Sequence, residues 1–284
     1  MADSYDRYKA AMLDPWKGWW IAWPLSQHID VGDVFDMSGG ALREAGDLAG
    51  RAIGFTSRPG APPGSFSYDS KGSVSVHFKS SGSVPQGFSA LTEVDAGALV
   101  EFESDSSVLV VYSGLAQEGF SDTRSVAADL ARLYWGGRWD SNLVAVSDVV
   151  HAASGLVLVA AQRGASAELR ATASAAAGPP TLVDLAGDVS FARSAHVGLR
   201  WAGSAVTPFY RVVRLRETWL HRITTQYGPR QPGRGAAPEA IPPLVLDEAH
   251  DDPGAVLENI AADEQPPASD SVGPETAPPP QPEP

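Results

Sequence analysis

The 284-residue chain contains no cysteine, which excludes every function that depends on a thiol. It can form no disulfide, no metal site built on thiolates, no cysteine nucleophile and no palmitoyl anchor. Long apolar runs are also missing, since 18 consecutive apolar residues occur nowhere, so we expect no membrane-spanning helix. The N-terminus, Met1 to Lys9, mixes acidic and basic residues, unlike a signal peptide. The expected location is the cytoplasm.

Basic residues are scarce, and the net charge of −13 is unevenly distributed. Residues 229–284 hold 14 of the 23 prolines, and eleven acidic residues against two arginines give this stretch a net charge of −9. The rest of the chain has a net charge of −4 and all eight tryptophans. Because nucleic-acid binding needs a surplus of Lys and Arg on one face, we expect no nucleic-acid partner. The composition predicts a globular domain over 1–227 and a disordered tail over 228–284.

Alternating apolar and polar residues predict strands throughout the globular part. In the clearest case, residues 73–79, the side chains of Val74, Val76 and Phe78 share one face. Helical spacing predicts helices at 3–13 and 121–135. Further strands are expected at 98–103, 107–112, 143–151, 156–161, 165–175, 189–201 and 206–215, with a turn near 154–155. The predicted fold class is α+β, a mostly antiparallel, twisted β-sheet with one or two packed helices.

Motifs that carry enzyme chemistry are missing. The six histidines form no His-x-x-x-His pair, and the chain has no nucleophile elbow, phosphate-binding glycine loop or dinucleotide fingerprint. Oxygen ligands at Asp30, Asp33 and Asp36 suit Ca²⁺, but Asp beside Gly is ordinary turn chemistry, and we prefer a loop. We therefore expect no catalytic site, no metal and no cofactor.

Four tryptophans crowd the N-terminal segment and invite a sugar-stacking, membrane-interface or partner-docking role. Because tryptophan is mostly buried in folded domains, we expect instead that they pack this segment onto the sheet. The four are Trp16, Trp19, Trp20 and Trp23. In the same way, Trp135 and Trp139 are expected to attach a helix end to the sheet.

Apolar and polar residues alternate along two arms of the segment 165–201, which are residues 165–175 and 189–201. Each arm is long enough to cross a bilayer as a tilted strand. An ordinary two-faced antiparallel sheet produces the same alternation. Arg193 falls on the apolar face of the second arm, where contact with lipid would cost ~2–4 kcal/mol. The apolar residues of this candidate membrane-inserting hairpin and its tip are Leu169, Leu182, Val183, Leu185, Val189, Phe191, Val197, Leu199 and Trp201.

The proline-rich tail contains one apolar island. A short segment that docks on the globular domain is one interpretation, and chance apolar content in a disordered tail is the simpler one. The candidate docking residues are Leu244, Val245, Leu246, Val256, Leu257 and Ile260.

The order of the predicted elements resembles the amino-terminal domain of gasdermins over about residues 5–226. Residues 187–191 and 205–215 look like the last hairpin and exit strand of that family, and residues 143–150 look like the strand after its central helix. In gasdermins, a C-terminal element holds the protein as an inactive monomer. Cleavage of the linker then frees the domain to oligomerise and insert β-hairpins as a membrane pore.

The resemblance implies that the tail inhibits and that an activating protease cuts near Arg222, Arg230 and Arg234. It further implies a monomer at rest, a homo-oligomer in the pore, and movement to a lipid membrane at the inner face of the cell after activation. Removing 229–284 changes the net charge from −13 to −4, which favours approach to anionic lipid. The chain departs from the family in lacking a cysteine for lipidation and in having no basic surplus.

The sequence therefore predicts a non-enzymatic, autoinhibited, gasdermin-like pore-forming effector of the kind used in bacterial defence. One alternative is a soluble binding or scaffold protein that recruits a partner through its tail. Another is an enzyme with an active site that cannot be recognised from the spacing of residues in the sequence. The strand order distinguishes them. Two long hairpins flanking the helix at 122–135 support a pore-forming domain, whereas a closed sandwich contradicts it.

Overall fold

The computed structural model describes residues 2–61, 64–70, 72–83, 86–171, 181–186, 189–228 and 240–267, and its fold is α+β, as predicted. Every strand pairing is antiparallel. No helix within these residues is long and apolar enough to cross a membrane. The helices are α1 (Ala2–Leu13), α2 (Thr123–Trp135), α3 (Leu182–Leu185), α4 (Glu217–Tyr227), α5 (Pro243–Asp251) and α6 (Pro253–Val256), with 3₁₀ turns at Ser38–Gly40 and Ala262–Glu264.

The strands form two sheets. The strands are β1 (Trp20–Ile21), β2 (Asp33–Asp36), β3 (Arg43–Asp47), β4 (Ser57–Pro59), β5 (Gly64–Asp69), β6 (Val74–Lys79), β7 (Gly97–Phe102), β8 (Val108–Phe120), β9 (Leu143–Ala160), β10 (Ser166–Ala171), β11 (Val189–Ala195), β12 (Val197–Leu215) and β13 (Leu257–Asn259). The larger sheet has the order β1-β12-β9-β2-β3; in addition, β8 pairs with β9, β4 and β5 pair with β8, and β13 pairs with β12. The smaller sheet has the order β11-β10-β7-β6.

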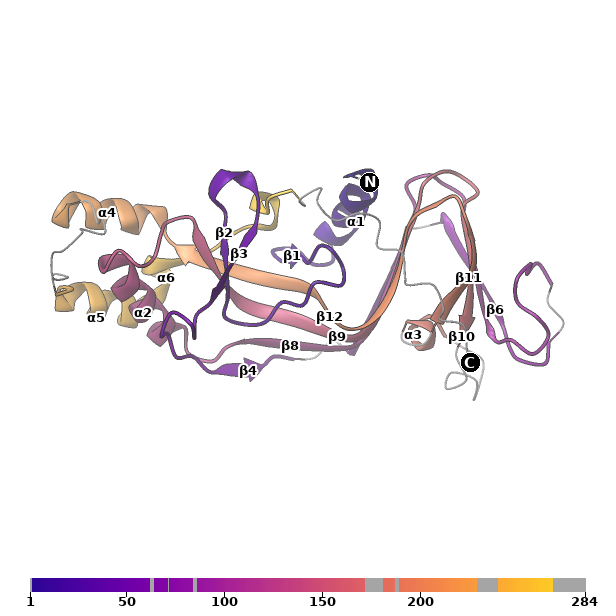
Figure 1. Cartoon of the computed structure of the whole chain (residues 1–284), viewed down its shortest axis with the longest axis horizontal. Coiled ribbons are helices and arrows are strands. Elements are labelled where there is room, and N and C mark those ends of the chain that lie inside the picture. Colours follow the sequence, from indigo (N-terminus) through magenta and orange to yellow (C-terminus); the bar gives the residue numbers. More distant parts are fainter. Residues whose placement is uncertain are drawn as a thin grey trace, which may run out of the picture.

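Three long strands, β8, β9 and β12, run through most of the molecule (Figure 1). Helices α2, α4, α5 and α6 gather at one end of these strands, and β6, β10, β11 and α3 lie at the other. The predicted turn at 154–155 is wrong, because β9 continues through it. Gly155 pairs there with Tyr112 and Gly203, and a Cβ on Gly155 would lie 2.6 Å from the Tyr112 ring. Glycine therefore provides room between strands here rather than a chain reversal.

Helix α2 forms as predicted, because all its signals are local. The Asp122 side chain accepts hydrogen bonds from the backbone N–H groups of Arg124 (3.0 Å) and Ser125 (3.3 Å). Val126, Leu130 and Leu133 follow at helical spacing, and all three are buried. The resulting apolar face is the centre of the core at the helical end of the molecule.

The tryptophan-rich segment packs onto the sheet, as predicted, although only β1 is a strand. Trp20 pairs with Tyr210 on β12 and is fully buried. The Trp16 ring stacks on Phe209, with ring centroids 4.2 Å apart. Trp135 and Trp139 are likewise buried in the core around α2. These indoles therefore serve the fold.

Strand β6 departs from its predicted two-faced pattern at its end. Phe78 is 43% exposed, whereas Lys79 is only 3% exposed. The Lys79 ammonium group donates hydrogen bonds to the backbone carbonyls of Glu93 (3.2 Å) and Asp95 (2.5 Å). The loop before β7 folds back over this end of the strand and supplies acceptors that the local sequence does not reveal.

Candidate functional site

The two long strands β9 and β12 continue past a sharp corner into β10 and β11. Ala160 pairs with Val197 on one side of the corner, and Ser166 pairs with Ala195 on the other. The corner consists of residues 161–165 on one strand and His196 on the other, where φ is +57°. Residues 143–171 and 189–215 are thus one long hairpin that is folded back on itself.

A second hairpin has the same form. Strand β5 pairs with β8 before the corner, and β6 pairs with β7 beyond it. Because β8 also pairs with β9, and β7 with β10, the two hairpins lie side by side in both sheets. We call the eight strands from β5 to β12 the folded ribbon. Its two hairpins flank α2 on either side in the sequence.

The corners of the folded ribbon are hydrogen-bonded to one another. The Ala161 N–H donates to the carbonyl of His196 (2.9 Å), and the Ala160 N–H donates to the carbonyl of Ser107 (2.9 Å). The hydroxyl of Ser107 donates to the hydroxyl of Ser73 at 2.8 Å. The four strands therefore turn at neighbouring positions, and these hydrogen bonds link the corners at which the ladders of the two sheets end.

Helix α1 lies against this line of corners. The Arg7 guanidinium donates to the carbonyl of Ala160 (2.8 Å), at the end of β9, and to that of Asp105, in the corner between β7 and β8. The hydroxyls of Tyr8 and Tyr112, both fully buried, are hydrogen-bonded at 2.7 Å. Helix α1 thus attaches to the outside of the bend.

The inside of the folded ribbon is an apolar core that both halves share. Leu109 and Leu156 come from the long strands, and Val100, Phe102 and Leu169 come from the smaller sheet. All five are at most 1% exposed. The two sheets therefore pack face to face over this core, and residues 161–165 and His196 connect their strands at the corner.

The predicted single apolar face over 189–201 is wrong. Val189, Phe191 and Val197 lie half-buried against the inner core, whereas Leu199 and Trp201 pack into the opposite core beneath α1. The strand breaks at His196, and a bulge between Val197 and Leu199 changes the side-chain phase. The remaining predicted residues divide as follows: Leu169 is fully buried in the inner core, Leu182 and Val183 of α3 are half-buried against it, and the Leu185 side chain lies outside the described residues.

Arg193 does not lie on the apolar face, contrary to the prediction from simple alternation. A bulge between Glu168 and Leu169 shifts the register, so that Arg193 pairs with Glu168 and Phe191 pairs with Leu169. The Arg193 guanidinium donates to the hydroxyl of Ser89 at 2.8 Å. The expected penalty for an arginine among apolar groups is therefore absent.

Glu168 is a buried carboxylate that the sequence analysis did not single out. Its side chain is 5% exposed and accepts hydrogen bonds from the N–H groups of Ser89 (2.8 Å), Ala90 (2.7 Å) and Leu91 (3.3 Å). Burial raises the pKa of this carboxyl, but these bonds and one from the Ser89 hydroxyl outweigh burial. The pKa of Glu168 therefore lies below its ordinary value of 4.5.

We expect Glu168→Gln to loosen the loop at 89–91 and to destabilise the protein at neutral pH by about 1.5–3 kcal/mol, the usual contribution of a hydrogen bond to a charged group. Because the folded-state pKa is lowered, this stability is present above pH 4.5 and is lost as the pH falls through the lower folded value. Thermal unfolding from pH 3 to 7 measures it. Glu103→Gln, at an exposed position, is the control, and an equal pH dependence of the two variants would contradict the assignment.

The prediction of a disordered tail over 228–284 is wrong for residues 240–267, which fold onto the domain. We call these residues the clamp. They form α5, α6 and β13, and β13 pairs with the end of β12. Residues 229–239 and 268–284 lie outside the described part of the chain. Free edges and apolar surface on the domain supply partners that the composition of the tail does not reveal.

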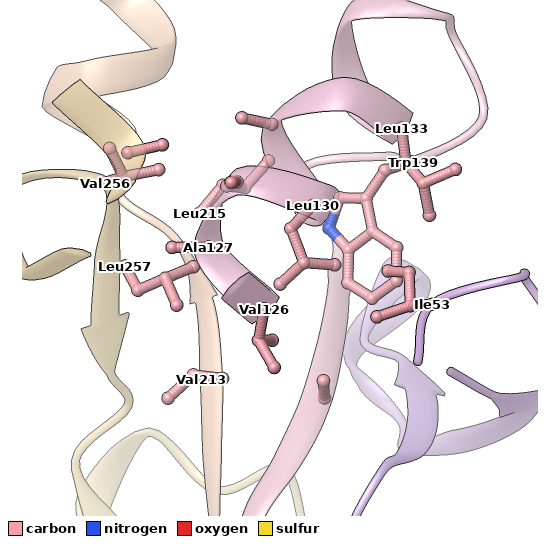
Figure 2. Packing of buried hydrophobic residues seen from close by; sticks show 14 of the residues in the cluster. Ile53, Val126, Ala127, Leu130, Leu133, Trp139, Val213, Leu215, Val256 and Leu257 are labelled. Carbon is pink, nitrogen blue, oxygen red and sulfur yellow. The ribbon is translucent and has the colours of Figure 1, made fainter. Parts of the chain in front are cut away.

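Four of the six candidate docking residues are buried in the clamp. Figure 2 shows Val256 and Leu257 beside Leu215 and the α2 residues Val126 and Ala127. The whole set divides as follows: Val245 (3% exposed), Val256 (0%), Leu257 (5%) and Ile260 (2%) are buried, Leu246 is half-buried, and Leu244 is 70% exposed.

Polar groups also attach the clamp to the sheet. The Gln265 amide accepts from the Ile21 N–H (3.1 Å) and donates to the Ile21 carbonyl (2.7 Å), as a neighbouring strand would. The Trp20 indole N–H donates to the carbonyls of Ile260 (3.2 Å) and Ala261 (3.1 Å). These contacts place the clamp across the edge of β12 and β1.

The predicted cleavage residues are only partly described. Arg222 lies on α4, exposed to solvent, and its guanidinium binds both carboxylate oxygens of Glu248 on α5. Arg230 and Arg234 lie outside the described residues. Cleavage after 228 would leave the clamp held only by noncovalent contacts.

The aspartates predicted as alternative Ca²⁺ ligands hold turns. Asp33 accepts a hydrogen bond from the Asp30 N–H (2.8 Å), and Asp36 accepts one from the Ser38 N–H (2.7 Å). Within the residues described, no group of three or more His, Asp or Glu side chains has a geometry that would hold a metal ion.

No protein-family model matches this chain, and no curated protein matches it either.

Proposed function

We propose that the chain is an autoinhibited, gasdermin-like pore-forming protein, in which the clamp keeps the folded ribbon closed. The observation that supports this proposal best is that two hairpins flanking α2 are folded at one line of corners. If the corners straightened, β9 and β10 would form one long strand, and β11 and β12 would form another. Each joined strand exceeds the 9–11 residues that a tilted strand needs to cross a bilayer.

An opened ribbon would have the two faces that a pore wall needs. The inner face beyond the corner contributes Val100, Phe102 and Leu169, which suit lipid. The other face carries Glu168, Arg170 and Arg193, which suit water. Register shifts put Arg193 on this polar side and so remove its cost in lipid.

The closed form is favoured in water because opening would expose the shared inner core. In a membrane, lipid tails replace that lost burial, so the balance depends on the surrounding solvent. The clamp further stabilises the closed state, because β13 covers an edge of β12 that is otherwise free to pair with another strand. Loss of the clamp would therefore lower the barrier to opening and expose a pairing edge at once.

Cleavage of the linker at 229–239 tests this proposal. We insert a specific protease site into that linker, cut the purified protein and measure dye release from anionic liposomes. We expect the cut protein to release dye at least about tenfold faster than the uncut one, a barrier decrease of about 1.4 kcal/mol or more. The matched control carries the same site in 268–284, where cutting leaves the clamp attached. Liposomes that stay sealed after the linker cut would favour a scaffold protein instead.

A further inference from the structure

Helix α3 lies in the connection between β10 and β11, so it belongs to the tip of the hairpin that runs from β9 to β12. It packs against β5 and β8, which are strands of the larger sheet and belong to the other hairpin. Figure 1 shows α3 next to β10, on the inner side of the bend. The tip of one hairpin therefore contacts the opposite half of the folded ribbon.

Apolar side chains hold α3 in this position. Leu182 and Val183 are half-buried against the inner core, and Ala186, directly after the helix, is 1% exposed within it. The same core contains Leu109 and Val111 of β8, which are at most 1% exposed. Burial of apolar surface thus attaches α3 to the larger sheet.

Helix α3 has only four residues, about one turn, and depends on this docking for its structure. Isolated helices shorter than about 12 residues are marginal in water, because the first turn fixes several residues for a single hydrogen bond. In α3, the Ala186 N–H donates to the carbonyl of Val183 (3.2 Å). We therefore expect α3 to unwind when it leaves the inner core.

The contact between α3 and β8 can exist only while the ribbon is folded. Strand β10 has six residues, so in a straightened ribbon its far end would lie about 20 Å beyond the corner, at about 3.3 Å per residue. Strand β8 lies on the other side of the corner and would extend away from that end. An interaction that is made in only one of two states shifts the equilibrium toward that state. Docking of α3 therefore favours the closed form.

The tip of the other hairpin, the loop between β6 and β7, makes contacts of a different kind. Glu168 on β10 accepts a hydrogen bond from the Ser89 N–H of this loop at 2.8 Å. The Nε atom of Arg170, also on β10, lies 3.1 Å from a carboxylate oxygen of Asp95. These contacts connect strands of the smaller sheet to one another, so they would persist if the corners straightened. The two hairpin tips thus differ in their dependence on the fold.

We propose that α3 is an internal latch of the folded ribbon, which keeps the hairpin of β9 to β12 closed on the hairpin of β5 to β8. The latch must leave the inner core before the corners straighten. Its effect in a membrane rests on the proposed function, whereas its effect on the folded ribbon does not. The clamp and the latch lie at opposite ends of the long strands (Figure 1), so two separate contacts restrain opening. After the clamp is released, the latch remains as the second restraint.

Thiol labelling of a buried cysteine measures opening of the ribbon, because the chain has no cysteine of its own. Ala167→Cys places a probe in the inner core, and Ala127→Cys places a reference probe in the separate core around α2; both alanines are 0% exposed. The full-length protein is labelled with a maleimide. We expect Leu182→Ala combined with Val183→Ala to speed labelling at 167 about tenfold or more, because it removes apolar contacts of the closed form. The rate at 127 should not change.

Val94→Ala is the matched control. It removes the same atoms as Val183→Ala from the tip of the other hairpin, where Val94 is 78% exposed, and should change neither labelling rate. If the double substitution leaves labelling at 167 unchanged, the latch is overturned. An equal increase at 127 also overturns it, because general loss of stability would then explain the result.

Dye release from anionic liposomes separates the latch from the pore. In the linker-cut protein, we expect the double substitution to speed dye release together with labelling at 167. Faster labelling at 167 without any dye release supports the latch and contradicts the proposed function. Dye release that the double substitution leaves unchanged, together with unchanged labelling, supports the pore and contradicts the latch.

Discussion

A disulfide between positions 214 and 258 should hold the clamp on β12 and keep the linker-cleaved protein as inactive on liposomes as the uncut protein. Arg214 and Glu258 lie directly opposite each other on β12 and β13, and their side chains meet at 2.7 Å. Facing positions on antiparallel strands have the Cα separation that a disulfide needs. Because the chain has no cysteine, Arg214→Cys with Glu258→Cys can form only this one intramolecular bond.

Reduction supplies the control within the same sample. Adding dithiothreitol to the cut, oxidised protein should restore dye release to the rate of the cut protein without the cysteines. Each single cysteine variant should leak at that rate whether oxidised or reduced. If the oxidised double variant leaks as fast as the reduced one, then clamp departure is not the step that controls membrane insertion.

A charge placed beneath the clamp should release it without any cleavage. Ile260 is 2% exposed and packs in the core with Trp20 and Tyr210. Truncating such a side chain to alanine costs about 2–5 kcal/mol. Ile260→Asp should cost more, because an ionised carboxylate there has no charge partner. We expect the uncut variant to leak dye spontaneously and to lose hydrogen-exchange protection over 257–262.

Leu244→Asp is the matched control, since Leu244 belongs to the same segment but is 70% exposed. It should leave leakage and exchange unchanged, as surface substitutions usually shift stability by less than about 0.5 kcal/mol. An Ile260→Asp protein that stays sealed while its clamp exchanges freely would separate clamp docking from inhibition. That result would contradict the proposed function but leave the fold intact.

The residues of α2 show what local sequence can predict. An aspartate cap, a 3.6-residue repeat and two glycines act within a few positions of one another, so Asp122, Val126 and Leu130 make the helix recognisable from the local sequence alone. The packing of Trp19 and Trp20 in the core, with Trp16 half-buried against it, was predictable because tryptophan has a large apolar area and is mostly buried in folded domains.

The hairpin shows where local sequence stops being sufficient. The alternation over 165–171 and 189–201 correctly indicated strands, whereas residues 172–175 lie outside the described part of the chain. Two bulges and the positive φ of His196 changed which residues share a face. A bulge moves the phase by one residue, and its position depends on pairing with a distant strand. Arg193 therefore changed from an expected liability to a polar-face residue.

Composition and periodicity by themselves determined the α+β class, the strand-rich body, the position of α2 and the absence of thiol chemistry. Only the tertiary structure decided that the ribbon folds on itself, that Glu168 is buried, and that residues 240–267 pack as a clamp. The physical reason is the range of the interactions. Helix caps and alternation act between near neighbours, whereas an edge strand such as β13 is ordered by a partner that lies more than 40 residues away in the chain.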